Sequence, residues 1–585
     1  EYLLNITYMF NNIGKINLIF DKKRKKILII LFCILLLVGF LETIGVALIF
    51  PMLSMIFIET DSNSKILIFF QSNLNIVDKF QMTKIIVIVF CSVTIIKNIL
   101  LVMSVWIKQK FTLDMQNSLA ANLLSVYLDK PISFHDDNNS ASIVRNLISE
   151  IKVVTKSYIL AYINIFSELI FLGILFVLLL FVNLKMTLII FVALSSISFI
   201  VLFFHKNKLN EFGEIKLKYG TLTFKILKET LDSIKEIKIN LQKDNTIRNF
   251  HKYIARSGKM GVLASVYGAF PRPLFESILI VSISVWLLFS LESGVSIIEF
   301  LPLLGLYLIS FMRVMPAVNR ILNNYQALKY SGPSFKKIFK DLKEYKTKSK
   351  AVNPKKIMLN EKIEFQNVTF NYDDNKNILE SINLIIKNNT FTGVVGSSGS
   401  GKSTLLDVML GFRKIKSGII KIDDIENDLY ANFGNWAENI CYVPQSVYIY
   451  DESIAKNITF EEDESLIDQE RLNKAIKASR LESFIENLPN KLKTNLGEVG
   501  DKISGGQKQR IGIARAIYKD LKIMIFDEST NALDKKTESE VLHNLKKISK
   551  YKIIIFATHS VDIINDLSDQ IISIEKGKLN LEKKI

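Results

Sequence analysis

Long apolar runs, separated by short charged stretches, dominate the first part of the chain. Each run is near or above the ~20 residues that an α-helix needs to cross a hydrocarbon core about 30 Å thick. The first run is too long for a signal peptide and lacks a small-residue cleavage site. We therefore predict six transmembrane helices, at about 27–57, 84–107, 157–182, 186–204, 262–291 and 296–318.

The stretches between spans two and three and between spans four and five are amphipathic and charged. We interpret them as cytoplasmic extensions of the transmembrane helices, with simple loops as the alternative. Each has one break, at 129–136 and at 231–236, where a short helix is expected to dock on the second half of the chain. The external segment 65–71 is too short to span, and fits either an amphipathic helix at the outer bilayer surface or ordinary loop packing.

The second half changes character, because short buried-strand patterns alternate with helical ones. One apolar pattern, 391–395, leads into a glycine-rich turn and then a helix, which is the context that the GxxxxGK[ST] pattern requires. The turn amides and Lys402 can bind the phosphates of ATP, and Ser403 can ligate Mg²⁺. The nucleotide-binding residues predicted from this turn are Gly396, Ser397, Ser398, Gly399, Ser400, Gly401, Lys402, Ser403 and Thr404.

A second buried-strand pattern, 521–526, ends in two acidic residues. Asp527 stands where a carboxylate can reach the magnesium ion, and Glu528 can act as general base on the attacking water. A helix cap or a solvated loop is the structural alternative for such a pair, and the upstream glycine-rich turn argues against it.

With these motifs the whole second half resembles the ATP-binding cassette (ABC) superfamily. By that resemblance Tyr372 stacks on adenine, Gln445 senses magnesium, and His559 contacts the γ-phosphate as a second catalytic residue. The metal ligands would be Ser403, Gln445 and Asp527. Residues 531–534 resemble the loop that communicates between two sites, and the signature residues are Ser504, Gly505, Gly506 and Gln507.

In this superfamily the signature of one copy completes the nucleotide site of another, so a homodimer with Mg²⁺ and ATP as cofactors is implied. We predict an α-helical six-span transmembrane domain with long cytoplasmic extensions at 1–330, a Lys-rich linker at 331–356, and an α/β P-loop nucleotide-binding domain at 357–585. One cassette after six spans resembles the half-transporter exporters of the superfamily.

Charge refines the picture. The formal net charge is +17, but the basic clusters flank the predicted spans. This pattern fits the positive-inside rule, with both termini and the ATPase in the cytoplasm, rather than nucleic-acid binding, for which no further motif is present. The three cysteines are scattered and suit neither a disulfide framework nor a metal site.

Ionisable residues within the spans indicate the cargo, since each is costly there unless paired or used. Cationic groups outnumber anionic ones even if Arg272 and Glu276 pair, which suits a lipid with a phosphate head. Short motifs around residues 40–45, 271–276 and 313–320 resemble the bacterial lipid-linked oligosaccharide flippases of protein N-glycosylation and their O-antigen relatives. The resemblance implies a polyprenyl-pyrophosphate glycolipid as substrate, bound in the bacterial inner membrane by Lys97, Arg272, Arg313 and Arg320.

Two other functions stay open. Export of a peptide, a drug or another lipid would use the same ATPase domain with a different cargo-binding cavity. An ATP-gated regulatory protein that moves nothing is the third possibility, and the presence of Glu528 and His559 argues against it.

Overall fold

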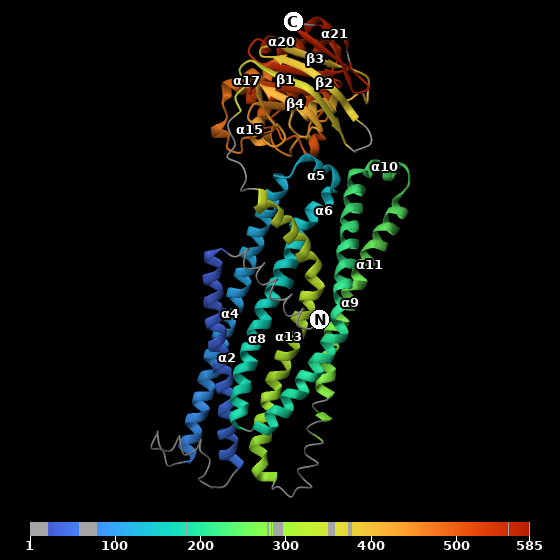
Figure 1. Ribbon diagram of the computed structural model, residues 1–585. Coiled ribbons are helices and arrows are strands. Elements are labelled where there is room, and N and C mark those ends of the chain that lie inside the picture. The colour runs from blue at the N-terminus through green and yellow to red at the C-terminus, as the bar shows by residue number, and fades with distance from the viewer. Residues whose placement is uncertain are drawn as a thin grey trace. The chain divides into compact units, whose positions relative to one another are not determined.

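The computed structural model describes residues 21–57, 79–182, 184–277, 280–281, 284, 297–348, 357–372, 377–559 and 561–583. The chain divides into two units. The first comprises Glu1–Lys130 and His135–Lys350, and the second comprises Pro131–Phe134 and Ala351–Ile585. Figure 1 labels the elements of each unit.

The first unit consists of helices, several of them very long. In chain order they are α2 (Lys22–Phe57), α4 (Lys79–Leu128), α5 (Ile132–Asp137, whose first three residues belong to the second unit), α6 (Ser140–Arg145), a π-helical turn (Asn146–Glu150), α7 (Ile151–Val153), a second π-helical turn (Val154–Ile159), α8 (Leu160–Val182), α9 (Leu184–Asp232), α10 (Ile234–Ile239), α11 (Lys243–Ala269) and α13 (Ile297–Lys348). Helix α2 packs on α4, α8 and α13, whereas α9 pairs with α11 (Figure 1).

Within the described residues, three stretches are long and apolar enough to cross a membrane. They are Lys22–Ile49, Thr83–Leu128 and Ser140–Phe181. The predicted spans at 186–204 and 296–318 fall within α9 and α13, and the one at 262–291 falls only partly in the described chain. The count of six therefore stays a prediction, and the external segment 65–71 lies outside the described residues.

The end of α4 and the two breaks in the helical extensions follow from the sequence. Helix α4 contains neither glycine nor proline over its 50 residues, and it stops just before Pro131. The residue before a proline is disfavoured in the α-helical conformation, so the chain turns there. The short helices α5 and α10 lie at the two breaks expected at 129–136 and 231–236.

Helix α13 differs from expectation at its C-terminal end. The stretch from residue 331 was expected to be a linker, but α13 continues to Lys348. Phe335 and Ile338 are 3% and 2% exposed, and the ring of Phe335 stacks on Tyr158 at 4.2 Å between centroids. Buried apolar positions three apart hold one helical face against its neighbours, despite the lysines on the rest of the segment.

The second unit contains two β-sheets. The four-stranded sheet has the order β2-β1-β4-β5, and the six-stranded sheet has the order β10-β9-β3-β8-β7-β6. The strands are β1 (Lys362–Asn371), β2 (Asn377–Lys387), β3 (Phe391–Val395), β4 (Ser417–Ile422), β5 (Ile425–Glu426), β6 (Ile440–Val443), β7 (Ile523–Asp527), β8 (Ile553–Thr558), β9 (Gln570–Glu575) and β10 (Lys578–Lys583).

Eight α-helices complete the described part of the second unit. They are α14 (Lys402–Met409), α15 (Phe433–Ala437), α16 (Ile454–Thr459), α17 (Gln469–Ala478), α18 (Glu482–Glu486), α19 (Gly505–Lys519), α20 (Lys535–Ile548) and α21 (Val561–Leu567). Three single 3₁₀ turns lie among them, at Glu464–Leu466, Lys491–Lys493 and Glu498–Gly500.

Strands β3, β7 and β8 are parallel and buried on both faces. Along β7, Met524 and Phe526 belong to the hydrophobic core on one side of the sheet, whereas Ile523 and Ile525 belong to the core on the other. Two-sided burial explains why these strands read as unbroken apolar runs in the sequence. It also fixes which residues emerge at the carboxyl edge of the sheet.

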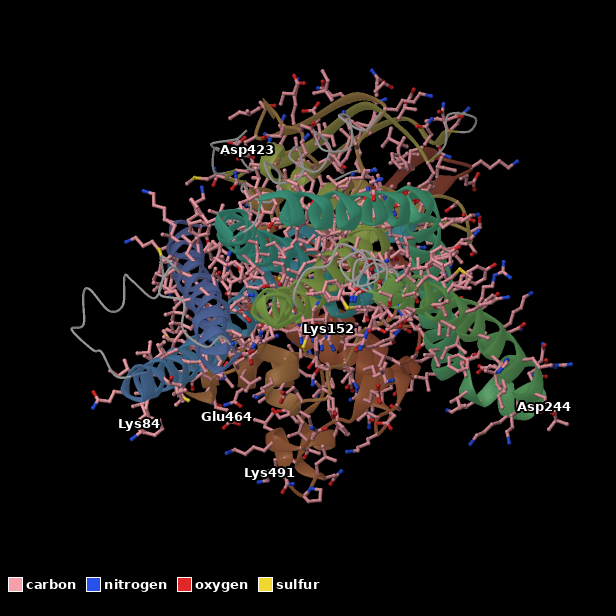
Figure 2. The ribbon with its side chains drawn as sticks, turned by 90° about the horizontal axis from the view of Figure 1, so that it is seen from below. Lys84, Lys152, Asp244, Asp423, Glu464 and Lys491 are labelled. Atoms are coloured by element: carbon pink, nitrogen blue, oxygen red, sulfur yellow. The ribbon has the colours of Figure 1, made fainter. Side chains whose placement is uncertain are left out.

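An aspartate closes the smaller sheet. Asp423, labelled in Figure 2, follows β4 and accepts hydrogen bonds from the backbone amides of Asn360, Glu361 and Lys362 at 2.7, 2.8 and 3.0 Å. Burial opposes ionisation of Asp423, but the amide bonds outweigh it and lower the pKa of this carboxyl. The side chain thereby anchors the start of β1.

Candidate functional site

The carboxyl ends of three parallel strands bring the predicted catalytic residues together. In register, Val395 of β3 pairs with Thr558 of β8, and Asp527 of β7 pairs with Ala557 of β8. The loops that leave these strands carry the glycine-rich turn, Glu528 and His559. Ligand sites of open parallel sheets form at this edge, because the loops leave it side by side.

The glycine-rich turn has the backbone that the motif requires. Gly399 and Gly401 adopt φ values of 76° and 111°, in the left-handed region that favours glycine. A side chain on Gly396 would lie 2.5 Å from the carbonyl oxygen of Ile574, so no other residue fits there. The turn leads directly into α14, whose N-terminus suits anionic oxygens.

Lys402 is buried, with 5% of its surface exposed, and it fills the turn with its own ammonium group. Its Nζ donates to the carbonyl oxygens of Gly396 and Ser397 at 2.8 and 3.2 Å. It also lies 3.7 Å from Oε1 of Glu528. The ammonium is therefore held by carbonyl and carboxylate oxygens. The phosphate oxygens of a nucleotide would take the place of these partners.

Glu528 receives partners on both of its oxygens. On Oε1, His559 Nε2 lies at 2.6 Å, in addition to Lys402. On Oε2, Gln445 Nε2 donates at 2.9 Å and Asn531 Nδ2 at 3.1 Å. The backbone of Glu528 is left-handed, with φ 47°, and its amide donates to the carbonyl of Ala557. A strained backbone and a crowded carboxylate at one residue are typical of a functional position.

Asp527 provides the test for a magnesium site. Its Oδ1 atom is buried and has no hydrogen-bond partner. Burial raises the pKa of Asp527, the hydroxyl of Ser403 opposes this rise by hydrogen bonding, and nearby Glu528 adds to it. An unpartnered buried carboxylate oxygen beside a serine hydroxyl is costly without a cation, so both residues fit Mg²⁺.

Tyr372 lies at the edge of the same region. Its ring is 53% exposed, its hydroxyl lies 3.3 Å from Oγ1 of Thr404, and the guanidinium of Arg413 is 5.1 Å from the ring centroid. An exposed aromatic face beside the glycine-rich turn can accept a purine ring.

The signature residues stand at a helix start. Ser504 caps α19 and forms a capping box with Gln507. A side chain built on Gly506 would lie 2.7 Å from the carbonyl of Ala532, so the signature packs against the 531–534 loop. Farther along α19, Gln509 accepts from the amide of Ala532 at 2.9 Å, while its Nε2 lies 3.5 Å from the carbonyl oxygen of Glu528.

Residues of the first unit predicted to contact cargo are all ion-paired. Glu42 Oε1 lies 3.2 Å from Arg313 Nη1 and 3.8 Å from Lys97 Nζ. Arg320 donates to both oxygens of Glu168, at 2.6 and 2.9 Å. Arg272 pairs with Glu276 at 2.9 Å, as its spacing of four suggested.

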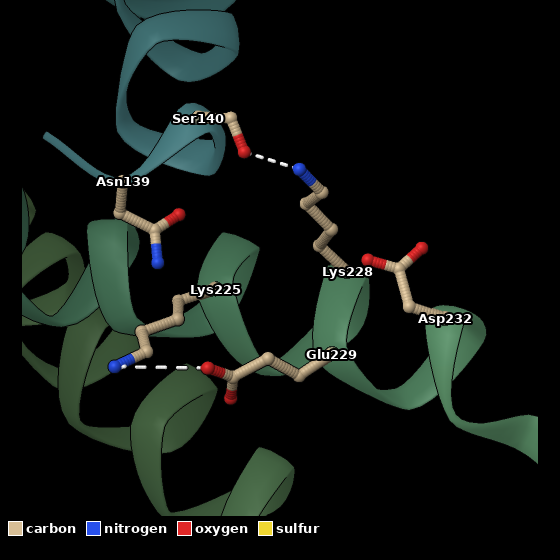
Figure 3. Close-up of a pocket in the computed structure, with 6 residues that line it drawn as sticks. All are labelled: Asn139, Ser140, Lys225, Lys228, Glu229 and Asp232. Atoms are coloured by element: carbon tan, nitrogen blue, oxygen red, sulfur yellow. Dashed lines mark hydrogen bonds and ion pairs between the residues drawn. The ribbon is translucent and has the colours of Figure 1, made fainter. Parts of the chain in front are cut away.

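A separate polar cavity of about 260 Å³ lies in the first unit (Figure 3). Asn139 and Ser140 line it from the start of α6, and Lys225, Lys228, Glu229 and Asp232 line it from α9. Lys225 pairs with Glu229, and Lys228 donates to Ser140. Four of the six lining side chains are thus held in two pairs, and none of the six was predicted from the sequence to bind a ligand.

Sequence reasoning missed two groups of residues. Asn531 was placed in a communicating loop, but its contact with Glu528 was not foreseen, although a spacing of three within a turn could have suggested it. Gln509 was not singled out. In the membrane half, the pairing of Glu42 and Glu168 with arginines of α13 could be found only from the structure, because the partners lie on different helices.

The arrangement is that of a P-loop ATPase domain joined to a bundle of long apolar helices. Residues 379–531 match the family model described as ABC transporter. A protein of Rickettsia bellii whose name describes an export ATP-binding/permease protein is 38% identical over 222 residues, which is 38% of each chain.

Two other comparisons cover more of the chain. An "ATP-dependent lipid A-core flippase" of Ralstonia nicotianae is 27% identical over 475 residues, covering 79% of this chain and 78% of that protein. The solved structure of a bacterial Atm1-family ABC exporter with ATP bound has a TM-score of 0.78 and 18% identity, covering 96% and 95% of the two chains.

These findings confirm the resemblance to the ABC superfamily. The second unit carries an ABC transporter ATPase domain, and the chain has the fold of an ABC exporter half-transporter. Apolar helices and this fold indicate a multi-pass membrane protein.

Proposed function

We propose that two copies of this chain form an ATP-driven flippase in the bacterial cytoplasmic membrane. Its cargo would be a lipid whose head is attached through phosphate, specifically a polyprenyl-pyrophosphate-linked oligosaccharide, moved from the inner to the outer leaflet. Both termini and the ATPase domain would lie in the cytoplasm.

The observation that carries the cargo class is the pair of arginines on α13. Arg313 and Arg320 are seven residues apart, about two helical turns, so they share one face of the helix. Their side chains are 49% and 53% exposed, whereas the carboxylates that hold them are 18% and 16% exposed. Guanidinium groups that reach out from an apolar bundle suit the diphosphate of a lipid.

The relatives support a lipid rather than a soluble cargo. Flippases of lipid A-core align with about four fifths of this chain, including its apolar helices. Export of a peptide, a drug or another lipid is the second candidate, since the residues at the ATPase site do not depend on the cargo.

ATP hydrolysis would proceed with the residues already assembled. The glycine-rich turn and Lys402 would bind the phosphates, Tyr372 would stack on adenine, and Ser403, Gln445 and Asp527 would hold Mg²⁺. The metal would neutralise charge on the transferred phosphoryl group. Glu528 would orient and deprotonate the attacking water, with His559 on the γ-phosphate, and Ser504–Gln507 of the second copy would close the site.

Purified protein in proteoliposomes tests the cargo. Vesicles would contain undecaprenyl diphosphate linked to a short glycan, a phospholipid alone, or a phospholipid with peptide. We expect ATPase stimulation and movement between leaflets for the first cargo only. Equal stimulation by phospholipid or peptide would favour the second candidate.

The variant Arg313→Gln/Arg320→Gln should lose glycolipid movement and the stimulation of ATPase activity by glycolipid. Arg248→Gln, at an exposed arginine of α11, makes the same kind of substitution away from the apolar bundle and serves as control. Unchanged glycolipid movement in the double variant would contradict the role of the two arginines.

A further inference from the structure

Two carboxylates in the apolar bundle hold the arginines in the way that a phosphate would. Glu168 takes both the Nε and the Nη2 donors of Arg320, one on each oxygen. This two-bond fork is the geometry by which arginine recognises phosphate as well as carboxylate. Glu42 engages the second arginine, Arg313, through one oxygen that also faces Lys97.

Both carboxylates come from helices other than α13. Glu42 belongs to α2 and Glu168 to α8, while Lys97 belongs to α4. A further polar chain lies beside Arg320, since Lys108 of α4 donates to Asn164 of α8, and Asn164 donates to Asn324 of α13. Each arginine pair therefore ties α13 to a different neighbouring helix.

The charge count at Glu42 is unequal. Two cations, Lys97 and Arg313, face one carboxylate, so this cluster carries an excess positive charge when empty. Glu168 likewise faces two cations, Arg320 and the nearby Lys108. An anionic headgroup of two phosphates would thus be attracted to both clusters and could compete with Glu168 for the fork of Arg320.

We propose that Glu42 and Glu168 are internal stand-ins for the phosphates of the cargo, which the lipid headgroup displaces. This inference rests on the proposed function, because it takes an anionic lipid head as the cargo. Displacement breaks the ion pairs that tie α13 to α2 and α8, so cargo binding and the loosening of α13 are one event. Without cargo, the same arginines that recognise the lipid headgroup hold these helices together and keep the ATPase rate low.

The pair formed by Arg272 and Glu276 does not share this role. Both residues lie in one helical segment, four positions apart. Opening that pair would release no second helix. The distinction between pairs within one helix and pairs between helices gives the experiment its control.

The test compares ATPase rates of full-length protein in proteoliposomes without added cargo. Glu42→Gln and Glu168→Gln each remove a stand-in charge while keeping the side-chain size. We expect the basal rate to rise about fivefold or more in each, within the range of coupling between linked sites. Glu211→Gln breaks an exposed pair with Lys208 within α9 and should leave the basal rate unchanged.

Added undecaprenyl diphosphate should stimulate the wild type but add little to the already raised rates of the two variants. Undecaprenol, which lacks phosphate, should stimulate none of them. Binding of the diphosphate, measured separately by quenching of a labelled lipid, should be retained or tightened in both variants, since the arginines remain.

If Glu42→Gln and Glu168→Gln keep the wild-type basal rate while the wild type responds to the diphosphate, the stand-in role is overturned and the cargo assignment survives. If the wild type does not respond to the diphosphate, the cargo assignment fails and the stand-in role fails with it. Should a glutamine variant not assemble, Glu168→Asp tests the same point, because it keeps the charge but is too short for the two-bond fork. A basal rate of Glu168→Asp equal to wild type would also overturn the proposal.

Discussion

At the scale of single residues, the ATPase site is defined by one crowded carboxylate. Glu528 has two partners on each oxygen, and they come from four separate positions along the chain. Lys402, His559 and Gln445 are the residues expected to turn toward nucleotide and magnesium. Asn531 is not expected to contact nucleotide or magnesium, so it is the donor that can stay bound to Glu528 throughout.

Replacement of the base gives the first prediction. Glu528→Gln should lower the rate of ATP hydrolysis by about 10²–10⁴-fold, the usual contribution of general acid–base catalysis. The amide keeps the shape and one acceptor oxygen, so nucleotide should still bind and remain trapped. The measurement is single-turnover hydrolysis beside equilibrium ATP binding; near-parental hydrolysis would disprove the assignment of the base.

The second prediction concerns Asn531, the donor expected to stay bound to Glu528 during the reaction. Asn531→Ala should lower kcat about fivefold, the value of roughly one net hydrogen bond. KM for ATP, the affinity for a non-hydrolysable analogue and the Tm of the protein should change little. Asn531→Ser restores a shorter donor and should recover part of kcat. A loss confined to KM or Tm would instead indicate a structural role.

At the scale of elements, the first π-helical turn explains a buried ion pair. Arg145 and Glu150 are five residues apart, 5% and 3% exposed, and 2.5 Å from each other. In an α-helix such residues point about 140° apart. The π-helical turn at Asn146–Glu150 closes i to i+5 bonds and brings the two onto one face. Arg145 also donates to Leu217 and Thr221 of α9.

Gly220 leaves the space that this arginine occupies. A side chain built there would lie 2.7 Å from Nη2 of Arg145. Gly220→Ala should push the guanidinium from Glu150 and destabilise the helical unit by about 3 kcal/mol, the cost of breaking a buried pair. Thermal unfolding in detergent measures it.

The matched control for Gly220→Ala is Gly258→Ala on α11, where nothing lies within 4 Å of the added atom. There the better helix propensity of alanine should leave stability equal or raised by up to about 1 kcal/mol. Equal Tm values for the two variants would refute the packing argument.

The sequence predicted the ATPase site better than the membrane half, for a physical reason. The glycine-rich turn, Asp527 and Glu528 each sit next to a strand, so local spacing specifies them. The pair between Arg320 and Glu168 joins residues 152 positions apart, and only helix packing decides it. The continuation of α13 past residue 331 was not predicted, because the many lysines of this segment mask the helical spacing of its few buried apolar residues. The π-helical turns have no signal in hydrophobic periodicity.

At the scale of the whole molecule, the single cassette gives the fourth prediction. If two copies share each nucleotide site, a mixed dimer of Lys402→Met and Ser504→Arg chains contains one site with both parts intact. Each variant alone contains none. The mixed dimer should therefore occlude one nucleotide, whereas either homodimer occludes none.

The assay for shared sites uses differently tagged chains purified together and labelled with a photoreactive ATP analogue. A site built within one chain would leave both chains of the mixed dimer defective, so absence of occlusion there would exclude the shared arrangement. Wild-type chains with the same two tags provide the reference for full occlusion.

The π-helical turns at Asn146–Glu150 and Val154–Ile159 have one last consequence. Each turn absorbs one extra residue locally, so the segments on either side keep their helical phase. Deleting one residue between 146 and 150 would restore ordinary winding and leave Arg145 and Glu150 four positions apart, still on one face. A relative one residue shorter here can therefore keep both the ion pair and the packing of the helix that follows.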